Sequence, residues 1–192
     1  SSGDGLEASC ENTVDAVSEY LHGQEIDGYA AVNMGAIGTI NHMAGGVTVT
    51  IEDDFSEIDP DLKQGETICL TDKQAEEFIH DRWGVADETN ENRMHRQSVY
   101  MTELKRLIKE KCQQSSTYPL DLYESVQDYM VTSINKSKFS KLALLVAKEK
   151  DEGEVSVDGT VGTDELGYAT FEPNEQSLEA AIAELFYEEY EE

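Results

Sequence analysis

The stretch GGVTVTI, residues 45–51, carries the strongest strand signal in the sequence. Val47, Val49 and Ile51 alternate with two threonines, and this period of two is typical of a half-buried β-strand. The paired glycines before the alternation indicate a turn. We therefore expect residues 36–40 to form the antiparallel partner strand.

On either side of this strand, apolar residues recur three to four positions apart, which is the spacing of amphipathic helices. Thr71 and Gln74 match a capping box, Gly84 is a stop signal, and Pro119 suits a first helical turn. The segments predicted to be helical are 12–22, 71–83, 95–112, 119–134 and 174–192.

The segment LALLVA at residues 142–147 is ambiguous, because periodicity alone cannot separate a buried strand from a buried helix. A strand is favoured because residues 154–161 and 167–171 form an alternating pattern that suggests a meander. A further short strand is predicted at residues 66–70.

Together these elements predict an α+β fold in which helices and strands occur in blocks, without βαβ alternation. Antiparallel strands within about residues 26–51 and 142–171 are expected to pack with four to five helices. We expect residues 1–192 to form a single domain. A flexible N-terminal segment (1–8) and an acidic C-terminal helix (174–192) complete the predicted organisation.

The 192 residues include 41 acidic and 14 basic side chains, which give a formal charge of −27 at pH 7. Residues 1–92 carry −18, residues 93–150 carry +5 and residues 151–192 carry −14. This charge excludes a protein that coats DNA or an anionic membrane through charge alone. The basic segment either packs beside the chain's own acids or forms one pole of a surface that meets partners at two places.

Glutamates crowd the C-terminal helix at intervals comparable with the phosphate spacing along a duplex. A protein partner with a basic surface is expected to contact Glu175, Glu179, Glu184, Glu188, Glu189, Glu191 and Glu192. Over this short stretch the chain resembles the acidic Tyr-Glu tails of phage antirestriction proteins that mimic DNA. A solubilising acidic tail is the alternative.

A basic face is predicted on the helix at 95–112 and just before it. Its members are Arg93, Arg96, Lys105, Arg106 and Lys109. This face could contact phosphate or an acidic partner, but it lacks the interleaved aromatic side chains that stack on bases. We therefore expect no direct binding of nucleic acid.

The acidic loop after the strand at 45–51 offers the oxygen ligands that Ca²⁺ prefers. The candidate metal ligands are Asp53, Asp54, Asp59 and Asp61. A solvated turn is the alternative, because the loop does not follow the EF-hand pattern. Apart from this calcium site no cofactor is expected, since the sequence contains no GxGxxG, GxxxxGK[ST], GxSxG or HExxH motif.

The expected function is non-enzymatic: an acidic protein that acts through protein–protein contact, such as an assembly or virion-type structural subunit. Its partner would be a protein with a basic surface or neighbouring copies of the same chain. One alternative is a nucleic-acid mimic that inhibits a DNA-binding enzyme. Another is a hydrolase whose site the fold assembles, with His42 or His80 close to a carboxylate or to Cys69.

No apolar stretch approaches the length of about 18 residues that a membrane span needs, and no signal peptide is visible. The expected location is therefore the cytoplasm or a virion, without membrane contact. The three widely spaced cysteines (Cys10, Cys69 and Cys112) suit reduced thiols. Ser1 at the start is compatible with a maturation cut or a tag remnant, and the acidity is also compatible with salt adaptation.

Overall fold

The structure, a computed structural model, describes residues 5–86, 88–150, 153 and 155–187. The contacts within the chain divide it into two units. Unit 1 consists of residues 1–10 and 28–149, and unit 2 consists of residues 11–27 and 150–192. That all 192 residues act as a single domain stays a prediction.

Unit 1 alternates helices with very short strands. In chain order its elements are β1 (Ala30–Val32), α2 (Ala36–Ala44), β2 (Thr48–Thr50), β3 (Thr67–Cys69), α3 (Asp72–His80), α4 (Asn90–Gln114), α5 (Tyr118–Val126), η1 (Gln127–Tyr129), β4 (Met130–Thr132) and α6 (Lys136–Val146). The strands form two antiparallel pairs, β1 with β4 and β2 with β3. Because each pair is so small, the helices supply most of the packing.

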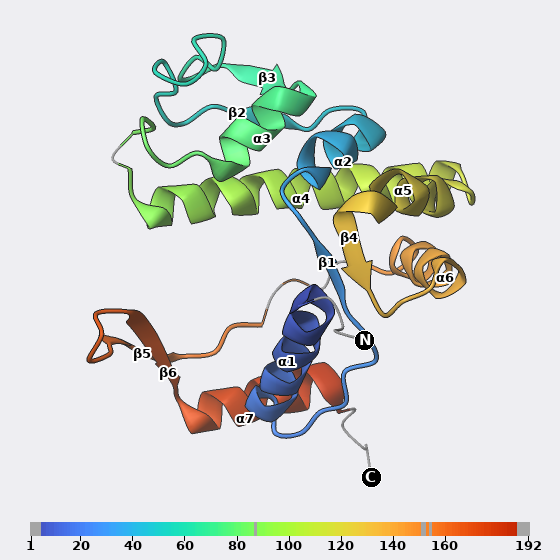
Figure 1. Cartoon of the computed structure of the whole chain (residues 1–192), viewed down its shortest axis with the longest axis vertical. Helices are drawn as coiled ribbons and strands as arrows, with labels where there is room; N and C mark the ends of the chain where they lie inside the picture. The colour runs from blue at the N-terminus through green and yellow to red at the C-terminus, as the bar shows by residue number, and fades with distance from the viewer. Residues whose placement is uncertain (1–4, 87, 151–152, 154, 188–192) are drawn as a thin grey trace. The chain divides into compact units, whose positions relative to one another are not determined.

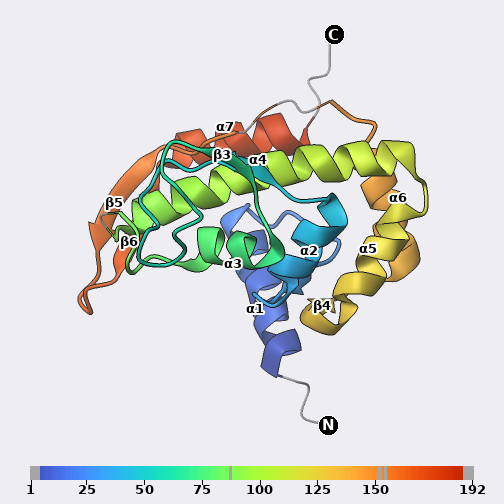
Figure 2. The ribbon, with the colours of Figure 1, turned by 90° about the horizontal axis from the view of Figure 1, so that it is seen from above.

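The main core of unit 1 lies where α2, α3 and the β2–β3 pair meet α4, the long helix that runs along this unit (Figure 1 and Figure 2). Its buried side chains are Ala44, Val47, Val49, Ile51, Phe55, Leu62, Leu70, Ala75, Phe78, Val85, Tyr100 and Leu104. The alternation at residues 47–51 is confirmed, because its three apolar side chains all enter this core while Thr48 and Thr50 stay exposed.

The partner strand predicted at residues 36–40 is wrong, because these residues form part of α2. Gly45 adopts a left-handed backbone with φ of +93°, and its N–H donates to the carbonyl of Asn41 at 3.1 Å, which closes the helix. The paired glycines therefore end a helix instead of turning a hairpin. The strand that pairs with β2 is β3, across the acidic loop, with Val49 opposite Ile68.

A second core of unit 1 lies between the end of α4 and helices α5 and α6. Its buried side chains are Cys112, Tyr118, Leu122, Val126 and Ala147. The strand predicted at 142–147 is wrong, because residues 142–146 belong to α6. Ala143 and Leu144 pack against the core whereas Leu145 is exposed, which is a helical distribution. The meander that favoured a strand begins only at residue 159.

The helix predicted at 119–134 is too long, because α5 ends at Val126 and β4 follows. Strand β4 pairs with β1, with Val131 opposite Ala31. The α+β class is confirmed. The described residues contain seven α-helices instead of four to five, since α2 and α6 add to the five predicted.

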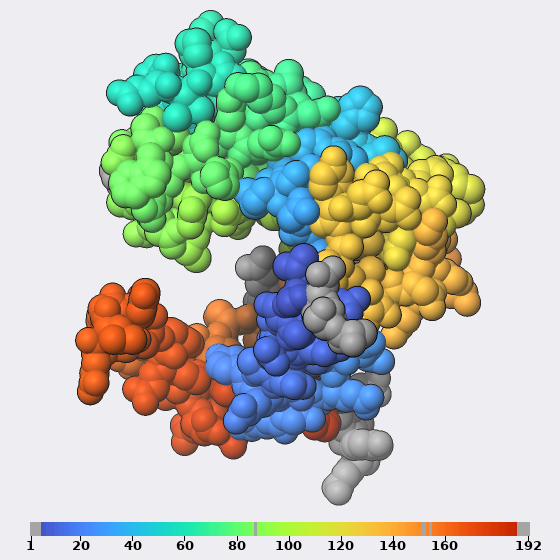
Figure 3. All heavy atoms as spheres, in the orientation of Figure 1, coloured from blue at the N-terminus to red at the C-terminus, as the bar shows by residue number. Residues whose placement is uncertain are grey.

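Unit 2 contains most of α1 (Gly5–Tyr20), the hairpin of β5 (Gly159–Thr163) and β6 (Ala169–Pro173), and α7 (Glu175–Phe186). The two strands pair antiparallel, and their side chains are almost all exposed. In the space-filling view the hairpin projects from the rest of this unit (Figure 3). In place of the expected meander, the described residues form one hairpin whose strands lie at 159–163 and 169–173.

Helix α7 is the acidic helix predicted at 174–192. Asn174 caps it, since the side-chain oxygen accepts the N–H of Ser177 at 3.0 Å. Its buried face consists of Leu178, Ala181 and Ile182. Residues 188–192 lie outside the described residues. At the other end of the chain, residues 5–8 of the segment predicted to be flexible belong to α1.

Candidate functional site

The candidate site lies where α3 ends and α4 begins, and Arg96 holds this region together. Its Nε donates to the carbonyl of Phe78 at 3.0 Å, and its Nη2 donates to the carbonyl of Asp81. Its Nη1 donates to Oδ2 of Asp53 at 2.7 Å. Because Arg96 is only 4% exposed, it ties the end of α3 and the acidic loop to α4 from inside the fold.

Two further arginines in this region carry buried nitrogens that have no partner in the described part of the chain. Among the described residues, no acceptor lies within hydrogen-bonding distance of Nε of Arg82 or Nε of Arg93. The guanidinium carbon of Arg82 lies 4.3 Å from the ring centre of the exposed Trp83, and Nη2 of Arg93 donates to Asn90. A buried donor left unpaired costs about 1–3 kcal/mol. A bound anion would remove that penalty. The unpaired donors of these arginines therefore suit the binding of a phosphate or carboxylate group.

A depression of about 280 Å³ lies along α3 beside this region. Its lining residues are Met34, Gly35, Ile37, Glu76, Glu77, His80 and Asp81. Oε2 of Glu77 is buried without a hydrogen-bond donor among the described residues, while Oε1 pairs with Lys73. Nδ1 of His80 lies 3.1 Å from Oδ1 of Asp81. Acid–base side chains therefore line a hollow that shares Asp81 with the region fastened by Arg96.

We call Arg82, Arg93 and Arg96 the arginine site. The sequence pointed to Arg93 and Arg96 through the predicted basic face, but it missed Arg82. The available signal was that Arg82 is one of only three basic residues in 1–92 and precedes the only tryptophan. Arg96 differs from the prediction in one respect, because it is buried and not part of an open face.

The rest of the predicted basic face does not join the arginine site. Arg106 lies between Glu103 and Glu110 on its own helix, and this hydrogen bonding lowers the pKa of Glu103 and raises the pKa of Arg106. Lys109 donates to the carbonyl of Glu149. Lys105 is exposed. These three basic residues thus lie on the later part of α4, where carboxylates engage Arg106 and a backbone carbonyl accepts from Lys109.

The four aspartates predicted to bind Ca²⁺ do not gather around one point. Asp53 is paired with Arg96, and Asp54 accepts the backbone N–H of Ser56, which lowers the pKa of that carboxyl. Asp59 accepts the N–H of Asp61 and a hydrogen bond from the side chain of Gln74. In the described part of the chain these oxygens do not form a three-ligand group. They act as local acceptors that shape the loop.

The histidines named for a hydrolase each meet an aspartate. His42 lies 3.4 Å from Asp72, and His80 lies 3.1 Å from Asp81. Both histidines are exposed, as is Cys69. Of the glutamates predicted to contact a partner, Glu175, Glu179 and Glu184 are exposed on α7, and the other four lie outside the described residues.

None of the described helices combines the length and the apolar character needed to cross a bilayer.

The chain belongs to the LytR_cpsA_psr family, whose model matches residues 8–186. No curated protein sequence matches it significantly. Solved structures share its fold. Lin1025 from Listeria innocua is 21% identical with a TM-score of 0.60, and the match covers 91% of this chain and 71% of that one. The transcriptional regulator EF0465 from Enterococcus faecalis is 18% identical with a TM-score of 0.66, covering 91% and 63%. TagV from Bacillus subtilis is 19% identical with a TM-score of 0.65, covering 93% and 71%.

Family membership corrects the function expected from composition. A virion-type structural subunit, a phage protein and a DNA mimic are all wrong, because the family model spans nearly the whole chain. The physical reason for the error is that the total charge is an average over the whole chain and does not describe any particular site.

Proposed function

We propose that this chain is a domain of a cell-wall glycopolymer transferase, acting on polymers of the teichoic acid or polysaccharide class. The family and the similarity in fold to TagV support this class. The observation that carries the proposal is that the buried Nε atoms of Arg82 and Arg93 have no hydrogen-bond acceptor among the residues that the structure describes. A phosphate-linked polymer would supply the acceptor oxygens that both lack.

The chemistry that follows is transfer of a phosphate-linked glycopolymer to a hydroxyl group. The acceptor oxygen forms a bond to phosphorus while the bond from phosphorus to the leaving phosphate oxygen breaks. Arg82 and Arg93 would bind the phosphate oxygens and neutralise charge that develops on them. Arg96 acts as a positioning residue, because Asp53 and backbone carbonyls already occupy it.

The proton of the acceptor hydroxyl needs a base close to the arginine site. Asp81 with His80, and Oε2 of Glu77, which has no donor among the described residues, are the acid–base groups of the neighbouring depression. We assign proton removal to this group. Its position next to Arg82 along the chain supports the assignment.

The description of EF0465 as a transcriptional regulator offers a second function, contact with DNA. The formal charge of −27 disfavours it, because phosphate repulsion would oppose approach over most of the surface. A local arginine site can still hold a single phosphate group, since a partly buried cation acts over a short range.

The test measures the binding of inorganic pyrophosphate to the full chain by isothermal titration calorimetry. Arg82→Lys and Arg93→Lys should each weaken binding by about tenfold or more, since a charge-assisted hydrogen bond contributes roughly 1.5–3 kcal/mol. Lys105→Ala is the matched control and should bind like the unaltered chain. Equal binding by the arginine variants and the control would refute the proposal.

A transfer assay with isolated teichoic acid precursor then separates binding from chemistry. Glu77→Gln and Asp81→Asn should lower the rate of transfer while binding of pyrophosphate is retained. An unchanged rate of transfer in both variants would exclude the depression as the source of the base.

A further inference from the structure

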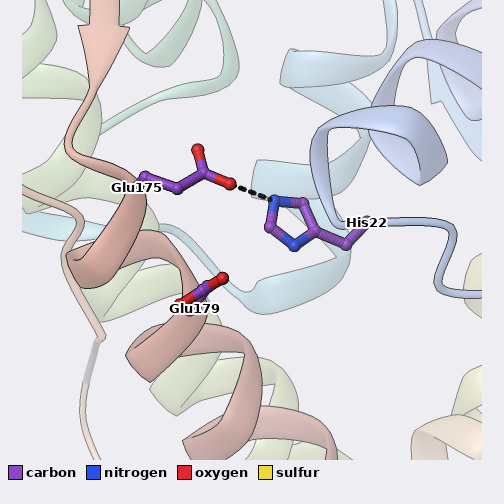
Figure 4. A group of neighbouring side chains, drawn as sticks. All are labelled: His22, Glu175 and Glu179. Carbon is purple, nitrogen blue, oxygen red and sulfur yellow. Dashed lines mark ion pairs between the residues drawn. The ribbon is translucent and has the colours of Figure 1, made fainter.

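We propose that unit 2 holds a site for a divalent transition metal ion of the zinc type, formed by His22, Glu175 and Glu179. Nε2 of His22 lies 3.2 Å from Oε1 of Glu175, and one ligand atom from each of the three residues lies within 4.8 Å of the other two. Figure 4 shows the imidazole and both carboxylates directed into the same space. This proposal does not rest on the proposed function, because the arginine site belongs to unit 1.

The distances between the three ligand atoms are close to those found around a bound zinc ion. Zinc lies about 2.0–2.2 Å from nitrogen and oxygen ligands, so ligand atoms around one ion are separated by at most about 4.4 Å. The three ligand atoms all lie within 4.8 Å of one another, a bound only slightly above that limit. Glu175 and Glu179 are four residues apart on α7, which places both carboxylates on one face of the helix.

The third ligand is held in place by its loop. His22 follows α1 with a left-handed backbone (φ +56°), and its N–H donates to the carbonyl of Glu19 at 3.1 Å. The next residue, Gly23, donates to Ser18 at 2.8 Å, and Ser18 in turn donates from its hydroxyl to Gln24. The imidazole is therefore presented by an ordered turn, which lowers the entropy lost when a metal binds.

The contact between this loop and α7 has an additional support outside the ligands. Nε2 of Gln24 donates to the hydroxyl of Tyr187 at 2.7 Å. The loop and the helix thus meet at two points in unit 2. A metal ion would join elements that are already in contact, so it requires no large rearrangement.

The charge of unit 2 is an independent reason to expect a cation there. Its segments, residues 11–27 and 150–192, contain 19 acidic side chains and a single Lys or Arg residue, Lys150. Since the unit has almost no basic group to balance its acids, a divalent ion would relieve repulsion that the fold leaves in place. The imidazole among the ligands favours zinc-type ions over Ca²⁺, which prefers oxygen ligands alone.

The ligand count also defines the class of site. Three protein ligands leave a fourth position of a tetrahedral ion open to water or to an outside ligand. All three residues are exposed, so this position faces solvent. The site would therefore suit an ion that contacts a second molecule, rather than a closed structural zinc.

The experiment measures Zn²⁺ binding to the full chain by competition with a metal-sensitive dye at physiological salt. One ion per chain is expected. His22→Asn removes the imidazole but keeps a residue that tolerates the left-handed backbone, and Glu179→Gln removes one carboxylate. Each change should weaken binding by at least about tenfold, since even changes to groups behind the ligands cost 10–100-fold.

Glu184→Gln is the matched control, because it removes the same charge from an exposed position on the same helix. Unchanged binding by this variant, beside weakened binding by Glu179→Gln, would support coordination over general charge attraction. Equal effects of both substitutions, or binding by His22→Asn like that of the unaltered chain, would overturn the proposal and leave an ordinary ion pair. Unchanged pyrophosphate binding by His22→Asn would show that such a failure does not concern the arginine site.

Discussion

Nη1 of Arg96 and Oδ2 of Asp53 lie 2.7 Å apart, and their side chains are only 4% and 17% exposed. Residue 53 belongs to the acidic loop and residue 96 to α4, so this pair joins segments 43 positions apart. The remaining donors of Arg96 are directed to backbone carbonyls at the end of α3. Because the buried guanidinium bonds to all these partners, it fixes the acidic loop and the end of α3 against α4. The arginine site depends on this arrangement.

Breaking this pair should destabilise unit 1. Asp53→Asn leaves a buried guanidinium without its counter-charge, and we expect the free energy of unfolding to fall by about 3 kcal/mol. Urea denaturation followed by circular dichroism measures this change. Lys105→Ala serves as the control and should change the free energy by no more than about 0.5 kcal/mol. A result for Asp53→Asn equal to that of the control would show that the pair contributes nothing to stability.

Asn41 is the second buried polar residue, and both the nitrogen and the oxygen of its side-chain amide form hydrogen bonds. Its Nδ2 donates to the carbonyl of Leu70 at 3.0 Å and to Asp72, while its Oδ1 accepts from the N–H of Val47 and the hydroxyl of Tyr100. Asn41→Leu keeps the volume but leaves these groups unpaired, so we expect a loss of at least about 2 kcal/mol of unfolding free energy. The same urea experiment on His42→Ala, an exposed neighbour, should show almost no loss. A stable Asn41→Leu protein would mean that water replaces the amide.

The stability of unit 1 should fall in alkaline solution through Tyr118. Burial, and to a smaller degree the charge of Cys112, raises the pKa of Tyr118 from 10.0 to about 12. Because the folded state favours the neutral phenol, the full stability is present below pH 10 and decreases as the pH rises from there toward 12. Tyr118→Phe cannot ionise and should lose part of this pH dependence.

The measurement compares urea unfolding of both proteins between about pH 9 and about pH 11, the range in which a tyrosine of ordinary pKa titrates. The exposed Tyr168→Phe is the control and should keep the slope of the unaltered chain. If the free energy of unfolding falls with pH equally steeply in Tyr118→Phe and in the unaltered chain, the buried phenol of Tyr118 does not cause the loss of stability.

Substitution of Gly46 should destabilise the protein more than substitution of Gly65, because only at Gly46 would a Cβ clash with another side chain. Both have left-handed backbones, with φ of +88° and +86°. A Cβ on Gly46 would lie 2.4 Å from Sγ of Cys69, whereas one on Gly65 would meet nothing within 4 Å. Gly65→Ala should therefore cost about 1 kcal/mol through backbone strain alone, and Gly46→Ala should cost about 1–3 kcal/mol more.

The double variant Gly46→Ala with Cys69→Ala identifies the clash. Thermal or urea unfolding should show that it recovers much of the additional loss, because the sulfur is gone. If the double variant is as unstable as the sum of the two single variants, the contact between these positions is not the cause.

Patterns confined to a few neighbouring residues were sufficient to predict several elements. The capping box of Thr71 and Gln74 is present at the start of α3, and the alternation at 47–51 points into the core. Leu178, Ala181 and Ile182 of α7 are buried, whereas Leu185 and Phe186 at its end are exposed. These features depend on backbone periodicity and on hydrogen bonds between residues three or four apart. Such interactions are fully specified by local sequence.

Where the local sequence suits both a helix and a strand, tertiary packing decides which of the two forms. Residues 36–40 and 142–147 each suit a strand by composition, but both are helical, because as helices they place one side against a core built by distant segments. The choice between the two forms depends on which neighbours cover the apolar side chains. No short window of sequence contains those neighbours.

The sequence by itself determined the charge distribution, the α+β class and the acidic character of α7. Only the tertiary structure decided which side chains meet: Asp53 with Arg96, and His22 with Glu175. The physical reason is that a periodic pattern acts over one or two helical turns, whereas these pairs join residues 43 and 153 positions apart. Their distances are set by the packing of whole elements, and it is this packing that brings together the arginine site and the proposed metal ligands in unit 2.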